Sequence, residues 1–65
     1  MEISAKRIKR YMGANLWTQE QLAKAAGVSR ATVNNALAKG ACSNKTAEKL
    51  SKALGVDPVE IMEEE

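Results

Sequence analysis

The feature that most constrains this chain is a pair of helix boundaries only two residues apart. Thr18 followed by Gln21 has the spacing of a capping box, in which each side chain accepts the other residue's free backbone N–H. Gly27 suits the left-handed residue that ends a helix, and Ser29 suits the N-cap of the next. So short a connection makes the two helices cross steeply rather than run antiparallel, so the stretch 18–39 is predicted to be a helix-turn-helix.

The second helix of this pair, predicted over about residues 29–38, has an unusual outer face. At about 100° per residue, Val33, Ala36 and Leu37 cluster on the inward side. The outer face and its flank carry Arg30, Ala31, Asn34 and Asn35. An ordinary solvated face would favour Glu, Lys and Gln, whereas mid-helix Asn lowers helix propensity. Because Asn and Arg pair bidentately with base edges in the major groove, this face either reads DNA or is a merely solvated surface.

The residues of this stretch resemble the Cro and phage-repressor type of helix-turn-helix, the xenobiotic-response-element family of regulators. The matching residues are Thr18, Gln19, Leu22, Ala23, Gly27, Val28, Ser29, Thr32 and Val33. A second stretch, 47–61, resembles the fourth and fifth helices of that family. The resemblance implies an all-α fold, a compact five-helix domain of the lambda-repressor-like type that spans residues 1–65.

The same resemblance implies which residues touch DNA, because in this family the second helix of the motif enters the major groove. Base reading is then expected from Arg30, Ala31, Asn34 and Asn35, with Arg30 on guanine, the two Asn on adenine and Ala31 on a thymine methyl. Candidate phosphate contacts are Thr18, Gln19, Thr32, Lys39, Ser43, Asn44 and Lys45. The family's path from the residue matching Val33 to Gly40 is often one residue shorter, which leaves the end of the recognition helix open.

The charge of the chain is divided between a basic body and an acidic tail. Residues 1–55 hold all ten Lys and Arg against three Glu, a net charge of +7, whereas residues 56–65 hold five acidic residues and no basic one. A basic body suits phosphate binding, which releases counterions from DNA. The tail is expected to be kept off the DNA. The basic cluster over residues 6–10 either contacts phosphate or is solvated surface.

The remaining elements follow from apolar spacing and from helix-boundary residues. A first helix is predicted over about residues 4–12, with Ile8, Tyr11 and Met12 inward, and then a loop over 13–16. Trp17, whose large ring is mostly apolar, is expected to pack on the core. A fourth helix, capped by Ser43 or Asn44, is predicted to end at Leu54 with Gly55 closing it. The run Asp57-Pro58-Val59-Glu60 predicts a fifth helix with a cap, Pro at its first position and an N3 carboxylate.

Catalysis has little support in this sequence. The chain has no His, the commonest general base near neutral pH, and its only cysteine, Cys42, has no His partner for a nucleophile dyad. Phosphate-cradling Gly motifs and metal-ligand spacings are absent from the sequence. We therefore expect no enzyme, no catalytic residues, no cofactor, no metal and no small-molecule ligand. Cys42 is expected to be a partly buried filler after the recognition helix.

Localisation and partners follow from the same observations. A single cysteine suits a reducing cytoplasm, and no apolar run approaches the ~20 residues that span a bilayer. We therefore expect a cytoplasmic protein, bacterial or phage-encoded, that makes no membrane contact. Because one domain buries little surface on DNA and family members bind as dimers, a weak homodimer is expected, free or formed only on DNA. Its subunits would meet through the fifth helix or the loop before the fourth.

The predicted function is sequence-specific regulation of transcription on double-stranded DNA, by a repressor that occupies an operator. The alternative is a small protein-interaction module of the same fold, such as an antitoxin or an adaptor. The two differ in their response to salt, because DNA binding weakens steeply as salt rises, whereas a protein-interaction module would give little or no gel shift at any salt concentration.

Overall fold

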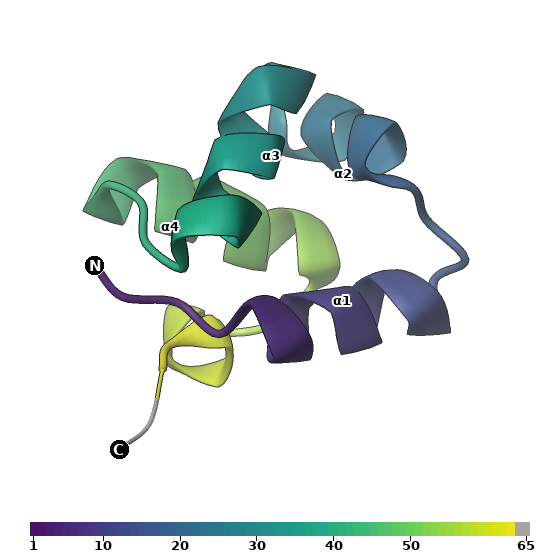
Figure 1. Cartoon of the computed structure of the whole chain (residues 1–65). Helices are drawn as coiled ribbons and strands as arrows, with labels where there is room; N and C mark the ends of the chain where they lie inside the picture. The colour runs from purple at the N-terminus through teal and green to yellow at the C-terminus, as the bar shows by residue number, and fades with distance from the viewer. Residues whose placement is uncertain (64–65) are drawn as a thin grey trace.

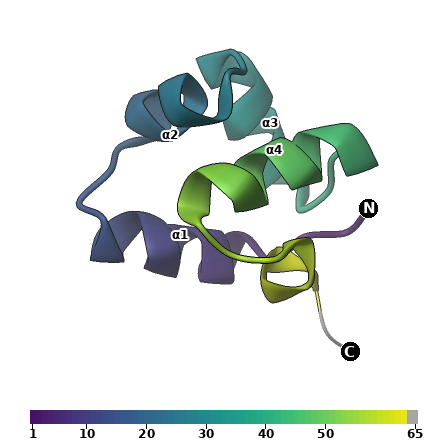
Figure 2. The ribbon, with the colours of Figure 1, turned by 180° about the vertical axis from the view of Figure 1, so that it is seen from behind.

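The structure is a computed structural model that describes residues 1–63. Within these residues the chain forms four α-helices and one short 3-10 turn. In both views of the ribbon, α4 lies between the crossed pair α2 and α3 on one side and α1 with the turn η1 on the other (Figures 1 and 2). The predicted all-α class is confirmed, but the fifth helix is a 3-10 turn. The elements are α1 (Ala5–Ala14), α2 (Gln19–Ala26), α3 (Arg30–Lys39), α4 (Asn44–Leu54) and η1 (Pro58–Ile61).

Each of the four α-helices begins at a hydroxyl N-cap. The side-chain oxygens of Ser4, Thr18, Ser29 and Ser43 each accept a hydrogen bond from the backbone N–H three residues further on. The predicted capping box of α2 is complete, because Thr18 N also donates to Gln21 Oε1 at 2.8 Å. The cap of α4 is Ser43, which settles the choice between the two predicted caps. Satisfying these otherwise free N–H groups sets where each helix starts.

The first helix is longer than predicted at its C-terminal end. It continues through Gly13 to Ala14, so the expected loop over 13–16 is wrong in its first half. The last turn is closed by backbone bonds from Asn15 N to the Tyr11 and Met12 carbonyls, and Asn15 Nδ2 donates to the Tyr11 carbonyl at 3.0 Å. These bonds offset the roughly 1 kcal/mol that Gly costs inside a helix, so Gly13 does not end it.

The predicted fifth helix is wrong in its form and in its cap. Asp57 makes no side-chain cap hydrogen bond, and Glu60 N donates to the Asp57 carbonyl in the three-residue pattern of a 3-10 turn. After one turn Met62 is extended and pairs with Ile3. The chain leaves the helical path because its backbone groups find partners in the N-terminal segment. Glu64 and Glu65, the end of the predicted acidic tail, lie outside the described residues.

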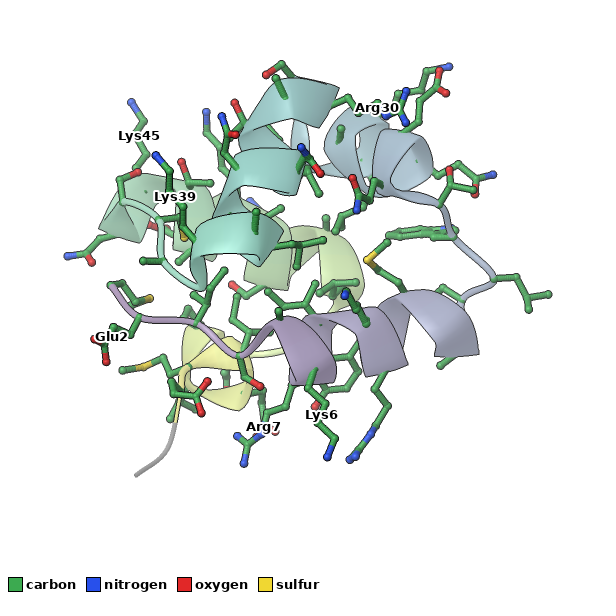
Figure 3. All side chains as sticks on the ribbon, viewed as in Figure 1. Glu2, Lys6, Arg7, Arg30, Lys39 and Lys45 are labelled. Carbon is green, nitrogen blue, oxygen red and sulfur yellow. The ribbon has the colours of Figure 1, made fainter. Side chains whose placement is uncertain are left out.

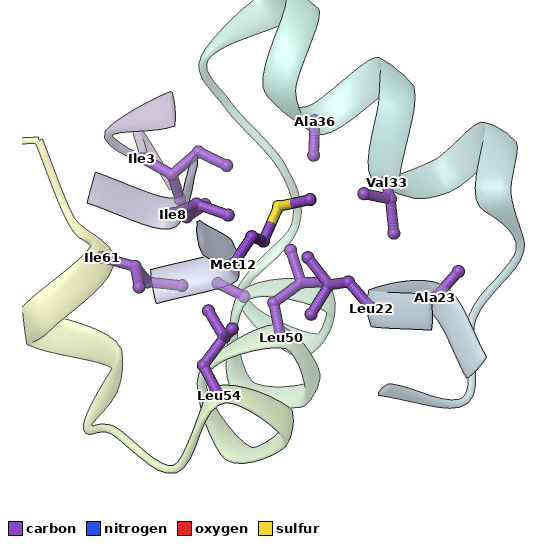
Figure 4. Packing of buried hydrophobic residues seen from close by; sticks show 11 residues of the cluster. Ile3, Ile8, Met12, Leu22, Ala23, Val33, Ala36, Leu50, Leu54 and Ile61 are labelled. Carbon is purple, nitrogen blue, oxygen red and sulfur yellow. The ribbon is translucent and has the colours of Figure 1, made fainter. Parts of the chain in front are cut away.

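One apolar cluster joins all five elements (Figure 4). Of the inward positions predicted from periodicity, Ile8, Met12, Val33 and Ala36 are buried. Tyr11 and Leu37 are half-buried against the cluster, as is Trp17. Gly40 is the left-handed residue that ends α3. The buried apolar residues are Ile3, Ile8, Met12, Leu22, Ala23, Val33, Ala36, Ala47, Leu50, Leu54 and Ile61.

The first four residues form an extended segment that sequence analysis missed. Residues 1–4, called the N-terminal strap from here on, lie between the connection that follows α3 and the segment that follows η1. Ile3 in the strap is 1% exposed. The sequence contained one signal for it: Ile3 and Ile8 flank the Ser4 cap at the spacing of a hydrophobic staple.

Leu16, in the loop between α1 and α2, has a backbone that does not suit its side chain. Its φ is +58°, and it is the only described residue other than Gly with a positive φ. Its side chain is 88% exposed. A left-handed conformation costs a side chain with a Cβ about 1–2 kcal/mol, and here no burial offsets that cost.

Leu16→Gly is therefore expected to raise the free energy of unfolding by about 0.5–1 kcal/mol, because relief of strain exceeds the added freedom of the unfolded chain. Gly27→Ala is the matched comparison, since Gly27 has φ +73° and an added Cβ would meet nothing within 4 Å. It should lower stability by about 1 kcal/mol. Urea titration measures both. A loss of stability in Leu16→Gly would mean that the Leu16 side chain makes a contact that outweighs the strain.

Candidate nucleic-acid interface

The turn between α2 and α3 determines which face of α3 is free. Gly27 ends α2 in the left-handed conformation, and Val28 N donates to the Ala23 carbonyl at 3.0 Å. Ser29 then caps α3, whose Val33 and Ala36 are buried in the core. The opposite face points to solvent, and all four predicted base-reading residues lie exposed on it or at its start. They are Arg30, Ala31, Asn34 and Asn35.

The N-terminus of α3 is closed by a hydroxyl pair. Ser29 Oγ accepts from Thr32 N at 3.1 Å and lies 2.8 Å from Thr32 Oγ1. Thr32, a predicted phosphate contact, is half-buried, and its hydroxyl is already paired with Ser29 Oγ in the helix cap. Arg30, directly after this cap, is exposed at the end of α3 where the helix dipole is positive.

The N-terminus of α2 lies beside the outer face of α3. Thr18, Gln19 and Glu20 line one shallow depression together with Arg30 and Asn34. Two of the predicted phosphate contacts, Thr18 and Gln19, therefore adjoin two predicted base readers, and Gln19 is half-buried there. Glu20 is an acidic residue in this depression that sequence analysis did not weigh, and a nearby phosphate would be repelled by it.

The remaining predicted phosphate contacts gather where α3 ends and α4 begins. Ser43 Oγ donates to Thr46 Oγ1 at 2.9 Å and accepts from Thr46 N at 3.2 Å. Lys39, Ser43, Asn44 and Lys45 are all exposed. Figure 3 shows Lys39 of α3 and Lys45 of α4 on the same side of the molecule as Arg30. Lys45 lies in the first turn of α4, a helix N-terminus that attracts anions, and Lys39 lies in the last turn of α3, separated from α4 by residues 40–43.

The basic cluster of α1 lies on the other side of the molecule. Figure 3 shows Lys6 and Arg7 projecting away from the side that carries Arg30, Lys39 and Lys45. A duplex held against the outer face of α3 is therefore not in reach of this cluster. Of the two interpretations left open by the sequence, the arrangement favours a solvated surface.

The acidic segment lies beside that basic cluster rather than beside α3. Glu60 lines a depression with Arg7, Arg10 and Tyr11, and Tyr11 OH donates to Glu60 Oε2 at 3.3 Å. The described acidic residue Asp57 lines the neighbouring depression. Asp57 and Glu60 thus lie with the α1 cluster rather than at the candidate interface, whereas Glu48 lines a depression with Lys45 in α4.

Metal-ligand clusters and membrane-spanning helices are both absent from the part of the chain that the structure describes. Among residues 1–63, no group of three His, Cys, Asp or Glu side chains is placed to hold a metal ion. Within the same residues, no helix has the length and apolarity needed to cross a bilayer. Cys42 is half-buried against the core, as predicted, and burial raises the pKa of its thiol, so at neutral pH it is a protonated and weakly nucleophilic group.

Comparison with known proteins agrees with this geometry. The sequence profile of a helix-turn-helix family matches residues 8–61, which covers α1 from Ile8 onward, the α2–α3 pair, α4 and η1. Comparisons with curated proteins and with solved structures gave no match. The chain therefore belongs to the helix-turn-helix family of the Cro/C1, xenobiotic-response-element type, a family of DNA-binding transcription regulators.

Proposed function

We propose that this chain is a sequence-specific regulator that represses transcription by occupying an operator with α3 in the major groove. The observation that carries the proposal is the outer face of α3. This face is exposed, carries mostly short Ala and Asn side chains, and has no acidic residue. The N-termini of α2 and α4 flank this face, and cations stand beside the second of them. A binding protein of this kind needs no catalytic residue, cofactor, metal or small-molecule ligand, and we propose none.

In this proposal the base edges are read by the exposed face of α3. Arg30, at the start of the helix, pairs with guanine, and Asn34 and Asn35 pair with adenine. Ala31 meets a thymine methyl. The small side chains Ala31 and Ala38, both exposed, let the helix backbone approach the bases closely. Support comes from the exposure of these residues on one side of a helix whose other side is buried.

The phosphate contacts are proposed for the two ends of this face, where they fix the register of the protein on the duplex without reading sequence. At one end are Thr18 and Gln19 of the α2 N-terminus, with Thr32 contributing through the cap it shares with Ser29. At the other end are Lys39, Ser43, Asn44 and Lys45, of which the two lysines supply the charge. Release of counterions from the neutralised phosphates then supplies much of the affinity.

We further propose that residues 1–65 act as one domain in the cytoplasm, and that two chains occupy one operator as a weak homodimer. Family members bind half-sites about one helical turn apart, and one chain offers a single recognition helix. Val59 in η1 is a large apolar side chain that is 58% exposed, which supports a subunit contact at η1. Sedimentation of the chain at high concentration, with and without a selected operator, should detect a dimer. Strict monomers in both samples would contradict it.

A gel shift at two salt concentrations tests DNA binding itself. A dimer that makes ~8 phosphate contacts should lose affinity by a factor of about 1,000 or more between about 50 and 200 mM salt. The physical reason is that each phosphate contact releases condensed counterions, which high salt disfavours. If the chain shifts no duplex at either concentration, it is a protein-interaction module rather than a DNA-binding regulator.

Two single substitutions separate base reading from phosphate binding. Asn35→Ala should cost about 1–3 kcal/mol on the preferred site and relax the preference at one base pair. Lys45→Ala should weaken binding to all sequences alike and lower the salt slope by about one unit. Both residues are exposed, so neither change should lower the stability of the fold much. Selection from a random DNA pool, repeated with each variant, measures the preference; an unchanged preferred site in Asn35→Ala would refute the assignment of Asn35.

A further inference from the structure

We propose that the N-terminal strap is a positioning element for DNA binding, because it holds the connection between α3 and α4 in the shape that places the phosphate contacts. The inference rests on the proposed function and adds a set of residues that do not touch DNA. The strap lies before residue 8, where the family match begins, so its role does not come with family membership.

The connection from α3 to α4 takes its backbone partners from the strap. Ile3 N donates to the Gly40 carbonyl at 2.9 Å, and Cys42 N donates to the Met1 carbonyl at 3.0 Å. The Met1 amine donates to the Cys42 carbonyl at 2.8 Å, and Glu2 forms an antiparallel bridge with Ala41. Three backbone groups of a four-residue connection are thus satisfied by the strap.

The opposite edge of the strap is fixed to the end of the chain. Ser4 N donates to the Ile61 carbonyl at 2.7 Å, and Glu63 N donates to the Glu2 carbonyl at 3.2 Å. Ile3 and Ile61 are both buried in the core. The strap is therefore anchored independently of the connection, and this is what allows it to hold the connection in place rather than move with it.

The segment held by the strap carries the phosphate contacts at both of its ends. Lys39 precedes Gly40, and Ser43 and Lys45 follow Cys42 directly or within the first turn of α4. The distance between the two lysine side chains and their angle to the α4 N-terminus depend on the path of residues 40–43. If residues 40–43 became more mobile, both lysine side chains would remain, but they would be in position to contact successive phosphates for a smaller fraction of the time.

The test removes single backbone donors without changing any side chain. A chain of 65 residues is within reach of chemical synthesis and ligation, so an ester oxygen can replace the amide N–H of Ile3. This removes the bond to the Gly40 carbonyl and also weakens the Glu2 carbonyl, which accepts from Glu63 N on the other edge of the strap. The matched control is the same replacement at Ser4, which breaks the bond to Ile61 on the other edge of the strap. Ile3→Val is a second control, since it trims the buried side chain and keeps the strap's backbone bonds.

Binding to a mixed-sequence duplex of about 20 base pairs is measured by fluorescence anisotropy as a function of salt, at a temperature where urea titration finds every chain folded. We expect the Ile3 ester to bind about tenfold more weakly, the effect of one lost charge-assisted contact. Its salt slope should fall by about one to two units. The Ser4 ester and Ile3→Val should keep the slope of the unmodified chain.

The outcomes distinguish this inference from the proposed function. If the unmodified chain binds with a steep salt slope and the two esters behave alike, the strap contributes only stability and the inference is overturned while DNA binding stands. An unmodified chain that does not bind the duplex overturns both. A lower salt slope in the Ile3 ester alone supports the inference. If the strap only stabilised the fold, both esters would lose stability, but the chains that remain folded would keep the same number of phosphate contacts and the same salt slope.

Discussion

The turn between α2 and α3 contains three residues, Gly27 to Ser29. The arrangement of the molecule depends on this short connection, because it fixes the angle at which the two helices cross. Gly27 supplies the left-handed conformation and Ser29 supplies the cap, so α3 must start at once and cross α2 steeply. Val33 and Ala36 are then directed into the core with Leu22. Because a helix that buries one side presents its other side to solvent, the exposure of Asn34 and Asn35 follows from the turn.

The charges of the described residues are sorted onto different sides of this scaffold. Lys39 and Lys45 stand on the side of the α3 outer face, whereas Lys6 and Arg7 project from the other side (Figure 3). Glu60 lies with the basic residues of α1, where Tyr11 OH donates to it. The excess charge of the body that the sequence predicted is therefore not all available to one duplex. Lys39 and Lys45 carry the electrostatic part of the proposed function, and the α1 cluster is partly balanced by η1.

Local signals in the sequence predicted most of the fold. Caps such as Thr18 and Ser29, and the glycines that end helices, act through hydrogen bonds within three or four residues, so their effect is visible in the sequence. The errors at the two ends of the chain, in the N-terminal strap and the fifth helix, arise where distant segments compete with local preference. Asp57 and Pro58 favour a helix, but the backbone after Ile61 pairs with the N-terminal strap instead. The strap itself pairs through its backbone, which leaves no periodic pattern of side chains.

The candidate interface was predictable to a similar extent and for similar reasons. Helical periodicity was enough to place the outward residues of α3, and the structure leaves all four exposed. It could not show that Thr32 shares its hydroxyl with Ser29, because that contact depends on side-chain rotamers. Nor could it show that Glu20 lies beside Arg30 and Asn34, since this proximity is set by the crossing of two helices.

The most direct test of the account is to map where a duplex touches the folded chain. In an NMR titration of the ¹⁵N-labelled full chain with a duplex of about 20 base pairs, the largest amide shift changes should fall on α3 and on the N-termini of α2 and α4. The amides of residues 6–10 should change least. Largest changes on α1, with the outer face of α3 unaffected, would contradict the account.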